Sequence, residues 1–427
     1  MPFEGRTSGW DDKVTSCCKT IARETNDSPL SGPSEWPLYH SGLALNNEPH
    51  ATPIDRGQTI VQISRIQISE CSIPLPYILR LGPVEIRNRD YVLLRVVCED
   101  GVFGEAIGYP RGTPLFETLS SMGRRILGAD SNMRRQVLFN LEQSNVPARA
   151  ALTRGLSLID IALWDIASKR AAQPLFQFLG GMRSAADVTV VAGYYVDQRG
   201  IGAVVDEVSL LKDAGCKRVK IMLKGDDAVF DHKYCSAVVE KMPSQVAADA
   251  HWTWNTLTEA RKVCRELDGL GLGFLEDPFA ASDVRLTHEL RRDLITPIAA
   301  GEDTFGPRVV SELVSGIDIL RVDATTVGGI TGAIEAINLA AGAGKTVFPH
   351  VFAPLHVHLA CAFPNVEAVE WITPECGADP LNLMLRNVPA VKEGQMKPSQ
   401  EPGIGISVDW EAAERHSRRH VVLSADN

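Results

Sequence analysis

The sequence lacks the features of an exported or membrane-spanning protein. Residues 1–30 contain no apolar run of signal-peptide length, and acidic residues such as Asp11 and Glu24 are atypical of a mitochondrial presequence. No apolar stretch approaches the roughly 20 residues needed to cross a bilayer. The nine cysteines are an odd number and include no Cys-x-x-Cys pair, which disfavours a disulfide framework and favours a reducing compartment. We therefore expect a cytoplasmic protein without a membrane partner.

An excess of positive charge is also absent. The 427 residues carry 43 Lys and Arg against 53 Asp and Glu, a net charge of −10, which argues against a nucleic-acid partner or an acidic membrane surface. The composition, 44% hydrophobic and 22% charged, is that of an ordinary globular protein. This length allows two domains with a substantial core.

The first half of the chain predicts a polar extension followed by a small domain. Residues 1–57 are polar and punctuated by proline and glycine, so we expect little regular structure there. Strand patterns follow at 59–69, 91–101 and 102–109, and helical patterns at 116–127, 131–142 and 149–179. Strands followed by helices predict an α+β capping domain over 58–185.

From residue 186 the pattern changes to alternating strands and helices. The apolar strand segments are 188–195, 218–223, 245–250, 272–277, 296–302, 318–324, 345–350 and 366–371. Eight such segments with helices between them predict an α/β fold, a (β/α)7β TIM-like barrel over 186–372. Residues 373–427 are expected to return to the capping domain.

Three acidic residues stand at the ends of three successive predicted strands. Asp249, Glu276 and Glu302 are 27 and 26 residues apart, about one strand–helix repeat. The carboxyl ends of barrel strands form the active-site mouth, and three carboxylates there favour a hard cation such as Mg2+. Asp277 directly follows Glu276, so strand alternation predicts that it points away, and we exclude it.

Further ionisable residues stand at the other strand ends. They lie on the second, third, sixth, seventh and eighth predicted strands: Lys220, His251, Asp323, His350 and Glu370. His251 follows Asp249 by two positions, so both side chains can face the mouth.

With these residues the chain resembles the enolase superfamily, in its mandelate-racemase-like branch. The resemblance spans residues 59–425 and includes the segments "LIDIALWD" (158–165) and "VGGIT" (327–331). It implies that Mg2+ is bound by Asp249, Glu276 and Glu302. It implies a catalytic dyad of His350 and Asp323, with Lys220 as the first lysine of a Lys-x-Lys motif and Glu370 near the substrate carboxylate.

Two departures from that branch narrow the expected chemistry. Met222 replaces the second lysine, and His251 stands where asparagine is common. Both features are similar to galactonate and mannonate dehydratases, which implies that His350 is the base and His251 the acid. A register in which Arg218 and Lys220 form the lysine motif remains an alternative.

The expected reaction is removal of water from an aldonate or aldarate to give a 2-keto-3-deoxy acid. The proton alpha to a carboxylate is weakly acidic, so a divalent ion and Lys220 are needed to stabilise the ene-diolate. A base alone gives exchange or racemisation, whereas an acid near the beta hydroxyl gives dehydration. A racemase or epimerase of a 2-hydroxy or 2-amino acid, and a non-catalytic barrel that retains its metal site, remain alternatives.

The capping domain is expected to choose the substrate, a small-molecule carboxylic acid. Segments 74–82 and 108–114 are predicted as the loops that cover the barrel mouth. Arg80, Arg111 and Tyr194, with its neighbour Tyr195, are the candidate substrate-binding residues. Similar enzymes are often symmetric, so we also expect a homo-oligomer.

Overall fold

The computed structural model describes residues 60–143 and 149–425, and the predicted extension 1–57 lies outside them. Eight parallel strands form the barrel: β4 (Ala186–Val191), β5 (Arg218–Met222), β6 (Val246–Asp249), β7 (Phe274–Glu276), β8 (Ile298–Ala300), β9 (Ile319–Val322), β10 (Thr346–Pro349) and β11 (Ala368–Ile372). Strands β4 to β10 pair in chain order, and β11 pairs with β4. A bridge between Val347 and Val366 links β10 to the segment before β11, which closes the ring.

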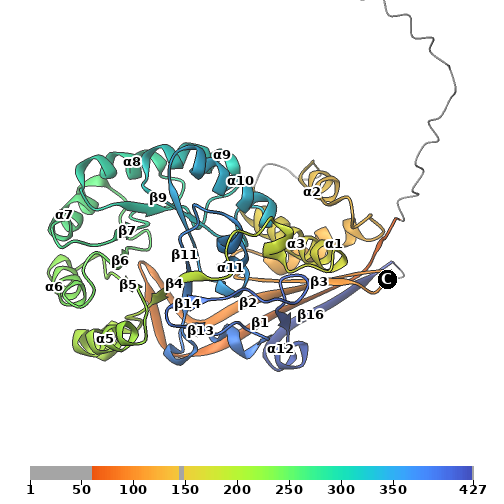
Figure 1. Ribbon diagram of the computed structural model, residues 1–427, viewed down its shortest axis with the longest axis horizontal. Coiled ribbons are helices and arrows are strands. Elements are labelled where there is room, and N and C mark those ends of the chain that lie inside the picture. The colour runs from red at the N-terminus through yellow and green to blue at the C-terminus, as the bar shows by residue number, and fades with distance from the viewer. Residues whose placement is uncertain (1–59, 144–148, 426–427) are drawn as a thin grey trace, which may run out of the picture. The chain divides into compact units, whose positions relative to one another are not determined.

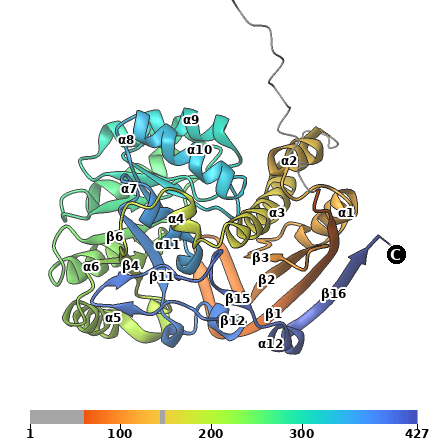
Figure 2. The same ribbon diagram turned by 45° about the vertical axis from the view of Figure 1, so that its right-hand side comes forward.

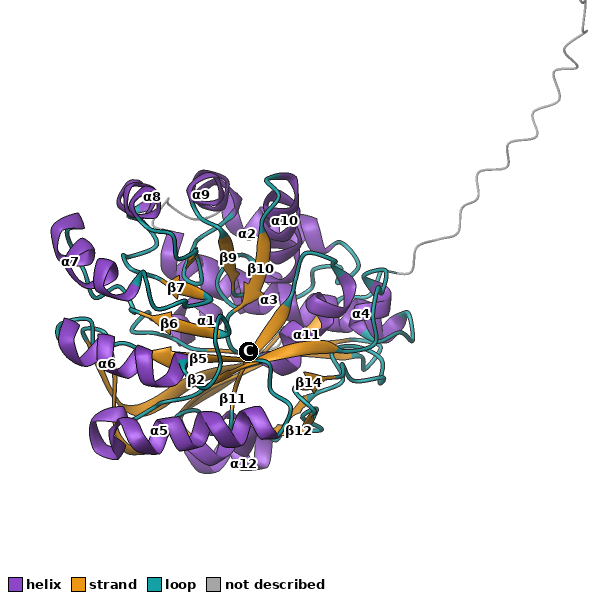
Figure 3. Cartoon of the chain, turned by 60° about the vertical axis from the view of Figure 1, so that its left-hand side comes forward, coloured by secondary structure: helices purple, strands orange, loops and turns teal. Residues whose placement is uncertain are grey.

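Seven helices alternate with these strands and cover their outer face (Figures 1 and 3). They are α5 (Val196–Asp213), α6 (Ala228–Val239), α7 (Leu257–Leu267), α8 (Val284–Asp293), α9 (Pro307–Leu313), α10 (Gly329–Gly342) and α11 (Ala353–Ala362), with a 3-10 turn η1 (Val314–Gly316) after α9. Strands covered on both faces read as apolar runs, which is why all eight were predictable. The (β/α)7β barrel is confirmed.

Side chains fill the barrel interior in layers. The lower layer is a small buried apolar cluster: Ala247, Phe274, Ala299, Phe348 and Ala368. Residues two positions apart share a strand face. On four of these strands, the residue two positions after the apolar one is polar and buried. These residues are Asp249, Glu276, His350 and Glu370. The apolar layer therefore supports a polar ring at the carboxyl end of the barrel.

A second, antiparallel sheet lies beside the barrel (Figure 2). Its order is β16 (Ser417–Ser424), β1 (Ile63–Leu81), β2 (Val84–Cys98) and β3 (Phe103–Gly108). The helices next to it in sequence are α1 (Leu115–Ile126), α2 (Arg134–Gln143), α3 (Arg149–Arg170) and α4 (Leu175–Phe178). The C-terminal segment thus completes the sheet of the cap, while the predicted domain boundaries themselves stay a prediction.

The remaining C-terminal elements are short. They are η2 (Pro374–Cys376), η3 (Pro380–Leu383), β12 (Leu385–Arg386), β13 (Val391–Lys392), β14 (Gln395–Met396), β15 (Ser407–Val408) and α12 (Trp410–His416). Strand β14 pairs with β4 at the barrel edge, and β12 pairs with β15. Between residues 60 and 425, no described helix has the length and apolarity of a bilayer-spanning segment.

Two predictions about the cap were wrong. Segment 74–82 is not a loop, because β1 continues to Leu81 and pairs with β2; its prolines are tolerated where the register shifts between Pro74 and Leu79. The helix predicted over 149–179 ends at Arg170, and α4 is separate. Pro174 has no N–H to continue the helix and disfavours helical backbone at the residue before it.

Candidate metal centre and active site

Three buried carboxylates stand where the sequence predicted metal ligands. Asp249 ends β6, Glu276 ends β7, and Glu302 follows β8 by two residues. All three are buried, and each keeps one oxygen that accepts no hydrogen bond within the described chain: Asp249 Oδ2, Glu276 Oε2 and Glu302 Oε2. A buried carboxylate oxygen without a donor is costly, and a hard divalent cation removes that cost. The residues present therefore fit Mg2+.

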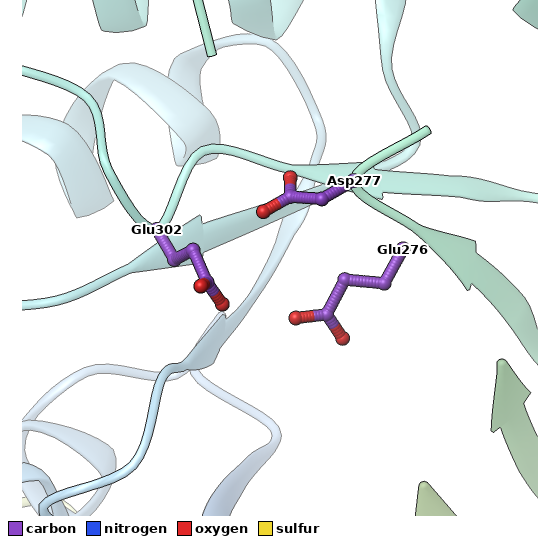
Figure 4. A group of neighbouring side chains, drawn as sticks. All are labelled: Glu276, Asp277 and Glu302. Carbon is purple, nitrogen blue, oxygen red and sulfur yellow. The ribbon is translucent and has the colours of Figure 1, made fainter. Parts of the chain in front are cut away.

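Asp277 also faces this space, so its exclusion was wrong. One carboxylate oxygen each from Glu276, Asp277 and Glu302 lie within 4.8 Å of one another (Figure 4). Strand alternation fails at Asp277 because β7 has ended and the backbone is left-handed there, with φ of 41°. Its Oδ1 accepts from the Gly301 amide and its Oδ2 from Trp252 Nε1, both at 3.2 Å.

Asp249 lies outside that group of three. Its Oδ2 forms an ion pair with Lys220 Nζ at 2.9 Å. Both oxygens of Asp277 accept hydrogen bonds, whereas the Oδ2 of Asp249 has only its ion pair with Lys220. The predicted ligand set of Asp249, Glu276 and Glu302 therefore stays a prediction, with Asp277 as a neighbour that the sequence reasoning missed.

Lys220 is enclosed by carboxylates. Its Nζ lies 2.9 Å from Asp249, 3.1 Å from Glu276 and 2.9 Å from Glu370. Burial by itself lowers the pKa of Lys220, but the three carboxylates raise it well above its usual value. Lys220 is therefore a fixed positive charge at the centre of the ring.

Arg321 is a second buried cation, and sequence reasoning did not identify it. It lies on β9, is 1% exposed, and donates from Nε to Glu276 Oε1 at 2.9 Å. Its Nη2 contacts Glu370 Oε2, and its Nη1 donates to the carbonyl of Phe348 at 2.9 Å. The available signal was a charged residue inside an apolar strand segment. Arg321 stands two positions before Asp323, so both side chains lie on the same face of the strand.

The predicted dyad is formed. His350 Nδ1 lies 3.0 Å from Asp323 Oδ2, while Asp323 Oδ1 accepts from the Thr325 amide at 2.7 Å. Burial lowers the pKa of His350 well below its usual value and raises that of Asp323 to about 7. A neutral His350 that donates from Nδ1 to Asp323 presents the lone pair of Nε2 to the mouth, as a general base requires.

Arg111 reaches this dyad from the loop between β3 and α1. Its Nη2 is 3.1 Å from His350 Nε2, and its Nη1 donates to Glu302 at 3.1 Å and to Asp303 at 2.7 Å. The loop at 108–114 was correctly predicted to approach the mouth. The structure brings Arg111 to both the predicted base and a predicted metal ligand.

His251 closes another side of the mouth. Its Nδ1 is 3.2 Å from Asp249 Oδ1, and its backbone is left-handed with φ of 46°. Burial lowers the pKa of His251 to about 4. It lines a cavity of about 670 Å³ together with Arg111, Trp252 and Asp303.

Arg80 and Tyr194 line a different cavity, of about 260 Å³, which also contains Met222 and Tyr195. Arg80 is mostly exposed and pairs with Glu85 at 3.1 Å. Two more histidines, His356 and His358, lie in α11 and use both ring nitrogens on backbone groups, so both are structural.

The chain matches two family models. Residues 69–180 match the mandelate racemase / muconate lactonizing enzyme N-terminal domain, and residues 203–413 match the enolase C-terminal domain-like model.

Several known proteins are similar to it. L-talarate/galactarate dehydratase of Salmonella typhimurium is 26% identical over 75% of this chain and 81% of that protein. Arabinonate dehydratase of Saccharolobus solfataricus is 26% identical over 61% of this chain and 71% of that protein. N-succinylamino acid racemase of Thermus thermophilus is also 26% identical, over 66% of this chain and 76% of that protein.

Solved structures share the fold. The Salmonella typhimurium L-talarate/galactarate dehydratase, liganded with Mg and L-lyxarohydroxamate, superposes with a TM-score of 0.78 at 24% identity, covering 86% of this chain and 96% of that one. L-talarate dehydratase of a Polaromonas species, complexed with Mg and L-glucarate, superposes with a TM-score of 0.75 at 23% identity, covering 86% of this chain and 99% of that one.

Proposed function

We propose that this chain, which belongs to the mandelate racemase/muconate lactonizing enzyme family of the enolase superfamily, is a Mg2+-dependent dehydratase of a sugar acid. Two of the relatives named above are sugar-acid dehydratases, and the two solved structures named above are described with Mg bound. The enzyme class is hydro-lyase and the cofactor is Mg2+.

One observation supports the proposal most. Glu302 Oε2, which accepts no hydrogen bond from any described residue, lies 3.4 Å from His350 Nε2. A cation ligand and a general base are therefore side by side at the mouth. That is the arrangement needed to remove a proton alpha to a carboxylate that the cation holds.

The roles of the residues follow from their positions. When bound, Mg2+ supplies positive charge for the substrate carboxylate as negative charge develops on it. His350 Nε2 takes the alpha proton, and Asp323 holds the ring through Nδ1. Lys220 gives a second positive contact to the developing ene-diolate, and its three carboxylate partners keep it charged.

His251 is the proposed acid that makes the reaction a dehydration rather than an exchange or a racemisation. It lines the cavity into which a beta hydroxyl would extend, and in its protonated form it donates the proton with which that hydroxyl leaves as water. The C–H and C–O bonds break in turn, and the enol left behind tautomerises to a 2-keto-3-deoxy acid. Glu370 and Arg321 hold Lys220 and Glu276 in place.

The proposal is tested by a semicarbazide screen for keto acids against aldonates and aldarates with Mg2+ present. Keto-acid formation that is lost in His350→Asn and on chelation supports it. Return of the other isomer with solvent deuterium and no keto acid would identify a racemase or epimerase instead. Bound Mg2+ without any turnover would identify a non-catalytic barrel.

A homo-oligomer remains part of the proposal. Sedimentation of the full chain measures it directly, and a single monomeric species would contradict it.

A further inference from the structure

Arg89 is a buried arginine without an ion pair. It lies on β2, is 8% exposed, and donates from Nε to the Ala378 carbonyl at 3.1 Å. No carboxylate of the described residues lies within 4.0 Å of its guanidinium, and Asp379 acts on its charge only from farther away. The other buried cations, Lys220, Arg154 and Arg321, each contact at least one carboxylate directly. A guanidinium stays protonated in proteins, and buried charges are normally paired.

Arg89 borders the large cavity, and part of its guanidinium carries no hydrogen bond to a described residue. Arg89 lines the same space of about 670 Å³ as His251 and Arg111. Nε is used by Ala378, and Nη1 and Nη2 have no hydrogen-bond partner anywhere in the described part of the chain. Two donors on one planar group suit a carboxylate, which accepts them side by side.

Arg89 also lies close to the reaction centre. The Cζ atoms of Arg89 and Arg111 are 5.2 Å and 6.0 Å from the same ring centre, that of Tyr109. Tyr194 lies near both Arg89 and Lys220: burial raises the pKa of its hydroxyl, and the charges of these two residues oppose that shift. A small acid held at Glu302 and His350 therefore has its far end within reach of Arg89.

We infer that Arg89 binds a second carboxylate of the substrate, at the end remote from the reaction, so that the substrates are aldarates rather than aldonates. This inference rests on the proposed function and names its substrate class. An aldonate places a hydroxymethyl group at Arg89 and leaves its two outer donors without a carboxylate partner, and sites with an unpaired buried polar group discriminate strongly.

The experiment compares acids that differ only at the far end. Galactarate is measured against galactonate, and glucarate against gluconate, with Mg2+ present. Turnover gives kcat/KM, and calorimetry with the His350→Asn protein gives affinities without turnover. The wild-type chain should favour each aldarate over its aldonate by both measurements.

Arg89→Met should lower kcat/KM and affinity for the aldarates by about 10²-fold and change those for the aldonates by less than about threefold. The aldarate affinity and kcat/KM of Arg89→Lys should lie between those of the wild-type chain and Arg89→Met, because lysine keeps the charge but lacks the two parallel donors. Arg65→Met is the matched control, since Arg65 is on β1 of the same hairpin but its side chain is exposed. It should preserve the preference. Circular dichroism confirms that each variant is folded.

The outcomes separate the two claims. Dehydration of aldonates in preference to aldarates, or an equal loss for both classes in Arg89→Met, overturns the role of Arg89 and leaves the dehydratase intact. Absence of turnover for all four acids contradicts the proposed function. Even without turnover, Arg89 is supported as the carboxylate site if the protein binds aldarates more tightly than aldonates and Arg89→Met abolishes that difference. Equal affinity for aldarates and aldonates would overturn the role of Arg89.

Discussion

Arg111 Nη2 lies 3.1 Å from His350 Nε2, the nitrogen that the proposed reaction needs as its base. The same guanidinium donates to Glu302, a predicted metal ligand, and to Asp303. One residue of the cap thus contacts both the proposed base and a predicted metal ligand. Binding of a cation at Glu302 competes with Arg111, which can stay paired with Asp303.

Arg111→Met should therefore bind Mg2+ more tightly than the wild-type chain, by roughly tenfold, because a positive charge is removed from direct contact with Glu302. Calorimetric titration of Mg2+ measures it. Arg80→Met removes the same charge from the other cavity and should leave the affinity unchanged. Weaker Mg2+ binding by Arg111→Met would show that Arg111 does not compete for the site.

His350→Asn and His251→Asn should separate two steps. The first should abolish exchange of the alpha proton in deuterated solvent, because the base is lost. The second should slow dehydration by roughly 10²–10⁴-fold while some exchange remains, because only the acid is lost. Proton NMR follows exchange and the semicarbazide assay follows dehydration. Equal loss of both activities in both variants would refute this division of roles.

Glu276→Gln and Asp277→Asn should differ in their effect on metal affinity. Glu276 has a donor-free oxygen, whereas Asp277 has both oxygens hydrogen-bonded. We expect Glu276→Gln to weaken Mg2+ binding by more than 10²-fold and Asp277→Asn by roughly tenfold or less, as for a residue that orients a ligand. The reverse order would make Asp277 the ligand.

Gly329→Ala should destabilise the fold by roughly 2–5 kcal/mol. Gly329 has φ of +77°, and a Cβ there would lie 2.2 Å from Asp160 Oδ2. That oxygen accepts from the Thr331 amide at 2.8 Å and ties α3 to the start of α10. Gly342→Ala, at the other end of α10 with no atom within 4 Å, should be neutral or stabilising. Urea unfolding of the two variants makes the comparison.

Stability should fall as the pH falls below about 6.5, in part because of His358. This ring accepts from the Phe176 amide and donates to the Ile404 carbonyl, and burial lowers its pKa to about 4. Between pH 6.5 and 4 the unfolded chain binds a proton that the folded chain excludes, so the free energy of unfolding decreases by up to about 1.4 kcal/mol per pH unit. His358→Gln should flatten this slope. An unchanged slope in His358→Gln would contradict the assignment.

The barrel and most of its site were predictable because they depend on local pattern. Each apolar strand segment ends in the residue that faces the mouth, so Asp249, Glu276 and His350 could be found without coordinates. Asp277 could not, because a single left-handed residue overrides strand alternation. That backbone angle has no signal in the sequence.

The cations that complete the site depend on contacts between distant segments. Arg321 is identified only when Glu276 and Glu370 are seen to flank it across the barrel. Arg111 was expected to bind substrate, but its contact with His350 spans 239 residues of chain. Arg89 has no sequence signal apart from its place in an alternating strand, and its missing partner is visible only in three dimensions.

The pairing of β16 with β1 has a consequence for biosynthesis. Ser69 and Ser417 meet across this pair although 348 residues separate them. During translation every strand of the barrel is therefore made before the sheet beside it can gain its last strand. The strands that carry Asp249, Glu276 and His350 are thus synthesised while the sheet of the cap still lacks its last strand, and late, long-range pairing of this kind is slow.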